Sequence, residues 1–183
     1  MNETLLALAR EAGFSHAAEL DPSALEAQPG VREMCAADKC HAYGKNWTCP
    51  PACGPLEECG ARMKSYRAGL LVQSTCELED EFDIDGMQEL EKRHLASFHA
   101  LADRLRAQHP DLFCLGTGGC RICSRCAWPE PCRFPDRACS SMEAYGLVVS
   151  DVCKKSGLPY YYGKNTLTYT ACYLWDRAAG EAR

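Results

Sequence analysis

The sequence predicts an α/β fold: a small mixed sheet with flanking helices and two cysteine-rich metal-binding loops. Short apolar segments of strand type alternate with segments of helical period, which favours an α/β sandwich. Two dense cysteine runs interrupt this alternation, and we expect them to pack at one end of the sheet. The chain has 183 residues, a length typical of one domain, so we expect a single cysteine-rich metal-binding domain over 1–183.

The first half of the chain carries helix and strand signals on both sides of the first cysteine run. Apolar residues at positions 5, 8, 9 and 12 follow a helical period, and the apolar run after residue 67 has the length of a buried strand. The expected elements are a helix over 4–12, a strand over 16–20, an irregular metal-binding loop over 30–54, a helix over 55–66 and a strand over 68–75.

The longest expected helix spans about 86–108. Leu90, His94, Phe98 and Leu101 recur along it at steps of three or four residues, which places them on one apolar face. We therefore interpret His94 as a core histidine with satisfied hydrogen bonds. The expected elements after this helix are a strand over 112–115, a helical turn over 141–145, a short helix over 149–155 and a final strand over 166–175.

Composition and the amino terminus indicate where the protein works. The first residues lack the basic and long apolar regions of a signal peptide, and no segment approaches the ~18 apolar residues of a membrane span. We therefore expect a cytoplasmic protein, in which thiols stay reduced and cysteine clusters favour metal over disulfides. The net charge of −5 argues against nucleic acid as a partner, and no membrane interaction is expected.

The second cysteine run is the strongest metal signal. Cys120, Cys123, Cys126 and Cys132 read C-x2-C-x2-C-x5-C. Three thiolates at the first spacing can wrap one face of a cubane, and they open the bacterial ferredoxin motif. Structural zinc sites usually combine two separate C-x2-C pairs. We therefore predict a [4Fe–4S] cluster at these four cysteines, with zinc as the alternative.

The first cysteine run predicts a second centre with a less diagnostic spacing. Cys35, Cys40 and Cys49 are predicted ligands, Cys53 is the predicted fourth ligand, and Cys59 is an alternative for that position. A radical-SAM loop needs a third cysteine two residues after the C-x3-C piece, and none is present. A [4Fe–4S] cluster is the favoured cofactor here too, which makes two clusters, while zinc stays open.

Other chemistry is sparse in this sequence. No P-loop, dinucleotide-binding, nucleophile-elbow or zinc-protease motif is present, so catalytic residues are unknown. Four arginines lie in or just after the second run, at positions 121, 125, 133 and 137. They either stabilise an anionic cluster or are ordinary exposed arginines without such a role. In an electron carrier they would form a docking rim for an acidic partner surface.

Three segments resemble a known family. C-x2-Y-G-K-N-W-T-C-P-P at 40–51, C-R-I-C-S-R-C-A-W-P-E-P-C-R-F-P at 120–135 and S-M-E-A-Y-G at 141–146 are similar to the predicted metal-binding proteins grouped as domain of unknown function 2284. The resemblance implies a cysteine-bound metal, with iron–sulfur favoured, in a bacterial or archaeal soluble protein. It supports Cys35, Cys40, Cys49, Cys120, Cys123, Cys126 and Cys132 as ligands, and it implies no particular reaction.

Two classes of function follow from these observations. The first is an iron–sulfur protein that transfers electrons to or from a partner enzyme, because full thiolate ligation leaves no iron open to substrate. The second is a cluster-dependent reductase with a small-molecule substrate. A zinc-stabilised interaction module is a further alternative. The sequence does not decide between a carrier and an enzyme, and a redox partner protein is expected for the carrier.

Overall fold

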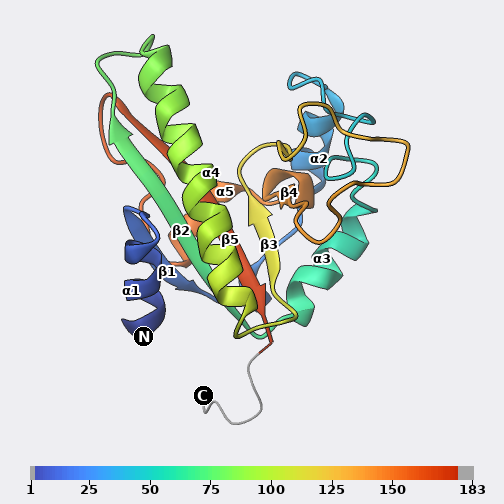
Figure 1. Ribbon diagram of the computed structural model, residues 1–183, viewed down its shortest axis with the longest axis horizontal. Coiled ribbons are helices and arrows are strands. Elements are labelled where there is room, and N and C mark those ends of the chain that lie inside the picture. The colour runs from blue at the N-terminus through green and yellow to red at the C-terminus, as the bar shows by residue number, and fades with distance from the viewer. Residues whose placement is uncertain (1–2, 177–183) are drawn as a thin grey trace.

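The computed structural model describes residues 3–176, which fold around one five-stranded sheet (Figure 1). The strands are β1 (His16–Leu20), β2 (Ala68–Glu77), β3 (Phe113–Gly116), β4 (Ser140–Ser141) and β5 (Thr166–Trp175). Their order in the sheet is β1-β2-β5-β3-β4. The β1–β2, β2–β5 and β5–β3 pairs are antiparallel, and β3 and β4 are parallel, so the sheet is mixed as expected.

Helices cover both faces of this sheet. They are α1 (Glu3–Glu11), α2 (Pro29–Ala36), α3 (Leu56–Ser65), α4 (Ile84–Arg106), α5 (Val149–Lys155) and the short 3-10 helices η1 (Pro22–Ala24) and η2 (Glu143–Tyr145). In Figure 1, α4 crosses the front of β2 and β5, and α1 lies on the same side near β1. Helices on both faces of the sheet give the layered α/β arrangement that alternating helix and strand patterns predict.

Two apolar clusters lie between the sheet and its helices, one on each face of the sheet. One face of β2 and β5 packs with α1 and α4, and its cluster includes Leu70, Phe98 and Tyr173. The opposite face packs with α3, η2 and α5 around Leu71 and Cys172. Leu71 and Cys172 are opposite each other in register, while Leu70 pairs with Tyr173, so alternate residues of the two central strands supply the two cores.

Helix α4 begins and packs as its sequence predicts. The Asp83 side chain accepts a hydrogen bond of 2.9 Å from the Gly86 N–H, which caps the first turn. The apolar face buries Leu90, Phe98 and Leu101 against the sheet. Phe98 and Tyr173 stack with ring centroids 5.3 Å apart, which fixes the helix over β5.

The segment expected as an irregular loop over 30–54 instead begins with a helix. Pro29 stands in the first turn of α2, where a missing N–H costs no hydrogen bond. Arg32 on this helix donates a 2.7 Å hydrogen bond to the carbonyl of Ala144 and so ties α2 to η2. The irregular cysteine loop is therefore confined to residues 37–55.

The other expected elements are confirmed. Helix α5 and strand β5 have the expected bounds, and the long helix begins and ends two residues earlier than expected. Within residues 3–176, no helix is both long and apolar enough to cross a membrane.

Candidate metal centre

The second cysteine loop, residues 117–139, is anchored at both ends on the sheet. It leaves β3 at Gly116 and returns as β4, which pairs with β3 in parallel. The Thr117 hydroxyl donates to the Thr170 carbonyl of β5 at 2.8 Å and lies 3.2 Å from His94 Nε2. These bonds hold the start of the loop to the core, so the cysteines that follow are positioned by the sheet.

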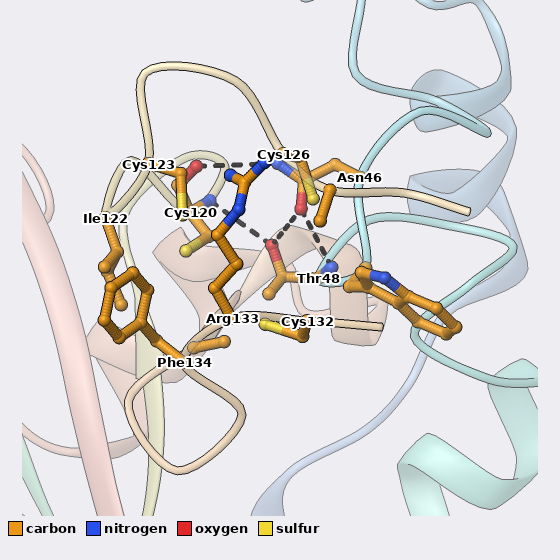
Figure 2. Close-up of a pocket in the computed structure, with 12 residues that line it drawn as sticks. Asn46, Thr48, Cys120, Ile122, Cys123, Cys126, Cys132, Arg133 and Phe134 are labelled. Carbon is orange, nitrogen blue, oxygen red and sulfur yellow. Dashed lines mark hydrogen bonds between the residues drawn. The ribbon is translucent and has the colours of Figure 1, made fainter. Parts of the chain in front are cut away.

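All four cysteines of the second run line one pocket at this end of the sheet (Figure 2). The pocket is narrow, with a cavity volume of about 20 Å³. Ile122 and Phe134 supply apolar wall, and the Arg133 side chain enters the same pocket. The loop therefore gathers Cys120, Cys123, Cys126 and Cys132, as their spacing predicts.

The sulfur of Cys120 lies in an environment suited to a bound thiolate. Hydrogen bonding with the backbone of Ile122 and Cys139 acts to lower the pKa of its thiol. Burial has the larger effect and raises the pKa of the Cys120 thiol. Amide hydrogen bonds to sulfur are one of the means by which proteins stabilise iron–sulfur clusters and adjust their potential.

The first cysteine loop, residues 37–55, is shaped by its own backbone hydrogen bonds. The Asp38 side chain accepts from the Tyr43 N–H and from Lys45 Nζ, both at 2.9 Å. Gly44 has φ +64° and donates to the Pro50 carbonyl at 2.9 Å, a conformation that glycine adopts at little cost. The loop therefore turns back on itself between Cys40 and Cys49.

Cys35, Cys40 and Cys49 are electrostatic neighbours at this first loop. Burial raises the pKa of Cys49 to about 11, and the nearby Cys40 and Cys35 sulfurs add to the increase. Burial also raises the pKa of Cys35, again with Cys40 as a neighbour. Metal binding here would therefore release protons from these thiols.

The two cysteine loops lie side by side and interlock through Asn46, Trp47 and Thr48 (Figure 1). Trp47 Nε1 donates to the Glu130 carbonyl at 2.8 Å, and its ring meets that of Trp128 edge to face. The Cys120 N–H donates to Thr48 Oγ1 at 3.3 Å, and Thr48 Oγ1 donates in turn to Asn46 Oδ1 at 3.0 Å. Hydrogen bonds thus connect the segment just before Cys49, a predicted ligand of the first loop, to Cys120, the first predicted ligand of the second loop.

Cys53 and Cys59 form a pair with Arg32. Arg32 Nη2 lies 3.1 Å from Cys59 Sγ and 3.5 Å from Cys53 Sγ, and it also donates to the Gly54 carbonyl at 3.0 Å. A hydrogen bond from Cys53, with a contribution from Arg32, lowers the pKa of Cys59 to about 7 despite burial. The same hydrogen bond raises the pKa of Cys53.

Cys114 and Cys139 form a second pair beside the second loop. A hydrogen bond from Cys114 lowers the pKa of Cys139, and the Arg106 guanidinium contributes to the same shift. The pKa of Cys114 is raised correspondingly, with burial adding to the effect. Because the Cys139 backbone is hydrogen-bonded with Cys120, this pair supports the wall of the predicted cluster site.

The donor set of the second loop fits a cysteine-bound metal. Four thiols share one pocket, and backbone hydrogen bonding acts to lower the pKa of one of them, Cys120. Within residues 3–176, no three His, Cys, Asp or Glu side chains already have the arrangement that holds a metal ion, so ligation requires a local convergence of these loops. The chemistry of four thiols without carboxylate or imidazole favours iron–sulfur or zinc over harder cations.

An open cleft of about 460 Å³ adjoins the metal pocket. His41, Lys45 and Arg121 lie on its wall together with Cys120 and Cys123. Lys45 pairs with Asp38 at 2.9 Å, and Arg121 pairs with Glu91 at 2.8 Å. The predicted cluster site therefore has an accessible side with several basic groups.

The residues that hold these loops together are not predicted by the cysteine spacing. Asn46, Trp47 and Thr48 stand inside the 40–51 motif, so their place between two predicted ligands was a signal that could have been used. Arg32 and Arg106 carry no local signal, because each meets its cysteine pair only through the fold.

The fold and the site together define a cysteine-rich α/β protein with a thiol-lined pocket at one end of a mixed sheet. The family described as predicted metal-binding protein (DUF2284) matches residues 18–175, and the chain belongs to this family. Metal binding is therefore supported, while the family description leaves the metal open. No curated protein and no solved structure matches the chain.

Proposed function

We propose that this protein binds iron–sulfur clusters and transfers electrons to or from a partner enzyme. The observation that carries the proposal is the pocket that Cys120, Cys123, Cys126 and Cys132 line together. A [4Fe–4S] cluster held by these thiolates would supply one-electron transfer. The chain itself contributes the thiolates, the backbone hydrogen bonding at Cys120, and the apolar wall of Ile122 and Phe134.

A second cluster is proposed at the first loop. Cys35, Cys40 and Cys49 are neighbours there and supply three thiolates. Cys53 is the fourth ligand that the sequence favours, with Cys59 as the alternative. The interlocked loops place the two donor sets next to one another, which suits a protein that passes electrons between clusters.

The test of this proposal is anaerobic purification followed by iron, sulfide and zinc analysis, with EPR of the reduced sample. We expect iron with acid-labile sulfide, broad absorption near ~400 nm that bleaches on reduction, and a reversible one-electron titration. Stoichiometric zinc without sulfide, after anaerobic expression in iron-replete cells, would show a zinc-stabilised interaction module instead.

The open cleft favours a second candidate, a reductase that passes electrons to a small anionic molecule. Its wall combines His41, Lys45 and Arg121 with cysteines of the second run. A substrate bound to an incompletely ligated iron would change the hyperfine couplings of the reduced cluster. Such coupling, detected by pulsed EPR with an isotopically labelled carboxylate or phosphate, distinguishes the reductase from the carrier.

A further inference from the structure

We propose that Thr48, oriented by Asn46, is a positioning residue of the second metal centre, although it belongs to the first cysteine loop. Its hydroxyl holds the Cys120 peptide in the place from which the Cys120 thiolate ligates the metal. The inference rests on the proposed function only in requiring a metal at the second loop. It applies to an iron–sulfur cluster and to zinc alike.

The pocket of the four second-run cysteines has a wall that comes from the first loop. That wall is formed by Asn46, Trp47 and Thr48. Figure 2 shows the Thr48 hydroxyl between the backbone of Cys120 and the side chain of Asn46. The second centre is therefore built from both loops, and its first ligand meets the other loop through Thr48.

The hydrogen bonds of Thr48 run in one direction. The Cys120 N–H donates to Thr48 Oγ1 at 3.3 Å, and the hydroxyl donates in turn to Asn46 Oδ1 at 3.0 Å. The Thr48 N–H also donates to Asn46 Oδ1, at 3.0 Å. Because Oδ1 accepts from both donors, the amide nitrogen of Asn46 faces the Cys120 carbonyl, which lies 3.5 Å away. Both backbone polar groups of Cys120 are thus bonded to the first loop.

Burial makes this arrangement sensitive to the loss of a single hydroxyl. Thr48 is 6% exposed, so removing its Oγ1 leaves the Cys120 N–H without its acceptor in a buried contact. A Cβ built on Gly119 would lie 3.7 Å from Cys49 Sγ, so the chain before Cys120 already touches the first loop. Cys120 also lines the open cleft, which gives a released peptide room to move away from that loop.

The test follows the release of metal from anaerobically purified protein into EDTA, with bound iron and zinc measured over time. The second centre is identified as the metal that Cys120→Ala does not bind. Thr48→Val keeps the shape of the side chain and removes the hydroxyl. It should release the metal of the second centre about tenfold faster than the wild type, because bonds that orient ligands have effects of this size on metal affinity. The first centre should keep its wild-type release rate.

Two matched variants separate positioning from general packing. Thr48→Ser retains the hydroxyl and should restore the wild-type release rate. Thr75→Val removes the hydroxyl that lies 2.9 Å from Thr168 Oγ1, on β2 and outside both loops, and it should release metal like the wild type.

Hydrogen–deuterium exchange of the Cys120 amide reports on the same bond directly. Exchange should be about tenfold faster in Thr48→Val and close to the wild-type rate in Thr48→Ser. Asn46→Ala should accelerate metal release in the same direction. Because Asn46 acts through Thr48, the double variant Asn46→Ala/Thr48→Val should release metal more slowly than the product of the two single effects gives.

Unchanged metal release in Thr48→Val would overturn the proposal, whether or not the Cys120 amide exchanges faster. Equal acceleration in Thr75→Val, acceleration of both centres, or faster release that Thr48→Ser does not restore would overturn it as well. If Thr48→Val does not fold, release and exchange in Asn46→Ala decide in its place. Zinc without sulfide, together with the expected Thr48 effects, would count only against the proposed electron transfer. A purified protein without bound metal would overturn both proposals.

Discussion

His94 shows how one buried residue joins the core to the candidate site. It is 1% exposed, and its Nδ1 lies 2.9 Å from Ser74 Oγ while its Nε2 lies 3.2 Å from Thr117 Oγ1. The interpretation of this residue as a satisfied core histidine is confirmed. The structure adds that Thr117 begins the second cysteine loop, so His94 also orients the approach to Cys120.

The burial of His94 predicts a loss of stability in acid. Burial lowers its pKa to about 4 from the ordinary value of 6.5, so the unfolded state takes up a proton first as the pH falls. Stability is fully present above about 6.5 and is lost progressively down to about 4, by an amount on the order of 3 kcal/mol. His94→Gln should remove this part of the pH dependence, measured by guanidinium chloride unfolding at several pH values. Exposed His41→Gln is the control, and an unchanged acid slope in His94→Gln would contradict the assignment.

Cysteine by cysteine, the sequence was informative where spacing acts locally. The C-x2-C-x2-C run predicts a shared location for Cys120, Cys123 and Cys126, and the pocket contains all three. The sequence did not indicate that Arg32 contacts Cys59, which lies 27 residues further along the chain. Such contacts depend on how α2 packs beside α3 and η2, and a single sequence does not specify that packing.

At the scale of elements, the bounds were predicted correctly where a local apolar pattern determines the element, and missed where tertiary contacts determine it. The bounds of helix α5 and strand β5 agree with the expected ones, because a local apolar pattern marks each element. Helix α2 was missed because it is only 8 residues long and none of them is buried. Its place is determined by polar tertiary bonds, such as that from Arg32 to the Ala144 carbonyl.

Gly146 is a sensitive point in the connection between η2 and α5. It has φ +79°, and a Cβ added there would lie 2.5 Å from Leu56 Cδ1 and 3.1 Å from the Gln28 nitrogen. Gly146→Ala should therefore lower the free energy of unfolding by roughly 2–4 kcal/mol, as backbone strain and steric overlap add. The measurement is guanidinium chloride unfolding of the purified protein.

Gly157→Ala is the matched control for Gly146→Ala. Gly157 also has a positive φ, of +74°, but a Cβ there meets nothing within 4 Å. It should cost only the strain of the left-handed backbone, about 1–2 kcal/mol. Equal losses in the two variants would mean that the contact with Leu56 and Gln28 relaxes without cost.

At the scale of the whole molecule, the two loops should hold separate centres despite their contact. Cys120→Ala should remove about half of the iron and spare the other cluster, because nine cysteines in the two runs exceed the four ligands of one cubane. Cys49→Ala should do the same for the other centre. Cys76→Ala, a cysteine on β2 outside both loops, should keep all of the iron.

The hydrogen bonds between the loops affect how the iron content of these variants is interpreted. Thr48 and Asn46 bond to Cys120 across the boundary, so a change on one side can alter the spectrum on the other. A shifted EPR signal with half of the iron retained agrees with two neighbouring clusters. Complete loss of iron from a still-folded Cys120→Ala or Cys49→Ala protein would mean that the loops share one cluster or depend on each other.

The arginines around the second loop should make the electric field at the site positive, although the net charge of the chain is negative. Arg121, Arg125, Arg133 and Arg137 are all exposed, whereas the whole protein has a net charge of −5. An anionic oxidant such as ferricyanide distinguishes the two fields, because added salt slows its reaction if the local positive charge governs and speeds it if the net negative charge governs. We expect stopped-flow oxidation of the reduced protein to slow with salt.

Removing two of these arginines should reverse or flatten that salt dependence. The double variant Arg125→Gln/Arg137→Gln changes the charge beside the pocket and leaves the pocket-lining Arg133 intact. Arg10→Gln/Arg67→Gln is the matched control, since it removes the same charge from exposed positions in α1 and just before β2. If both double variants keep the original salt slope, the arginine rim does not steer anions to the cluster. Docking of an acidic partner at this surface would then lose its electrostatic basis, because the same local field would have to draw the partner in.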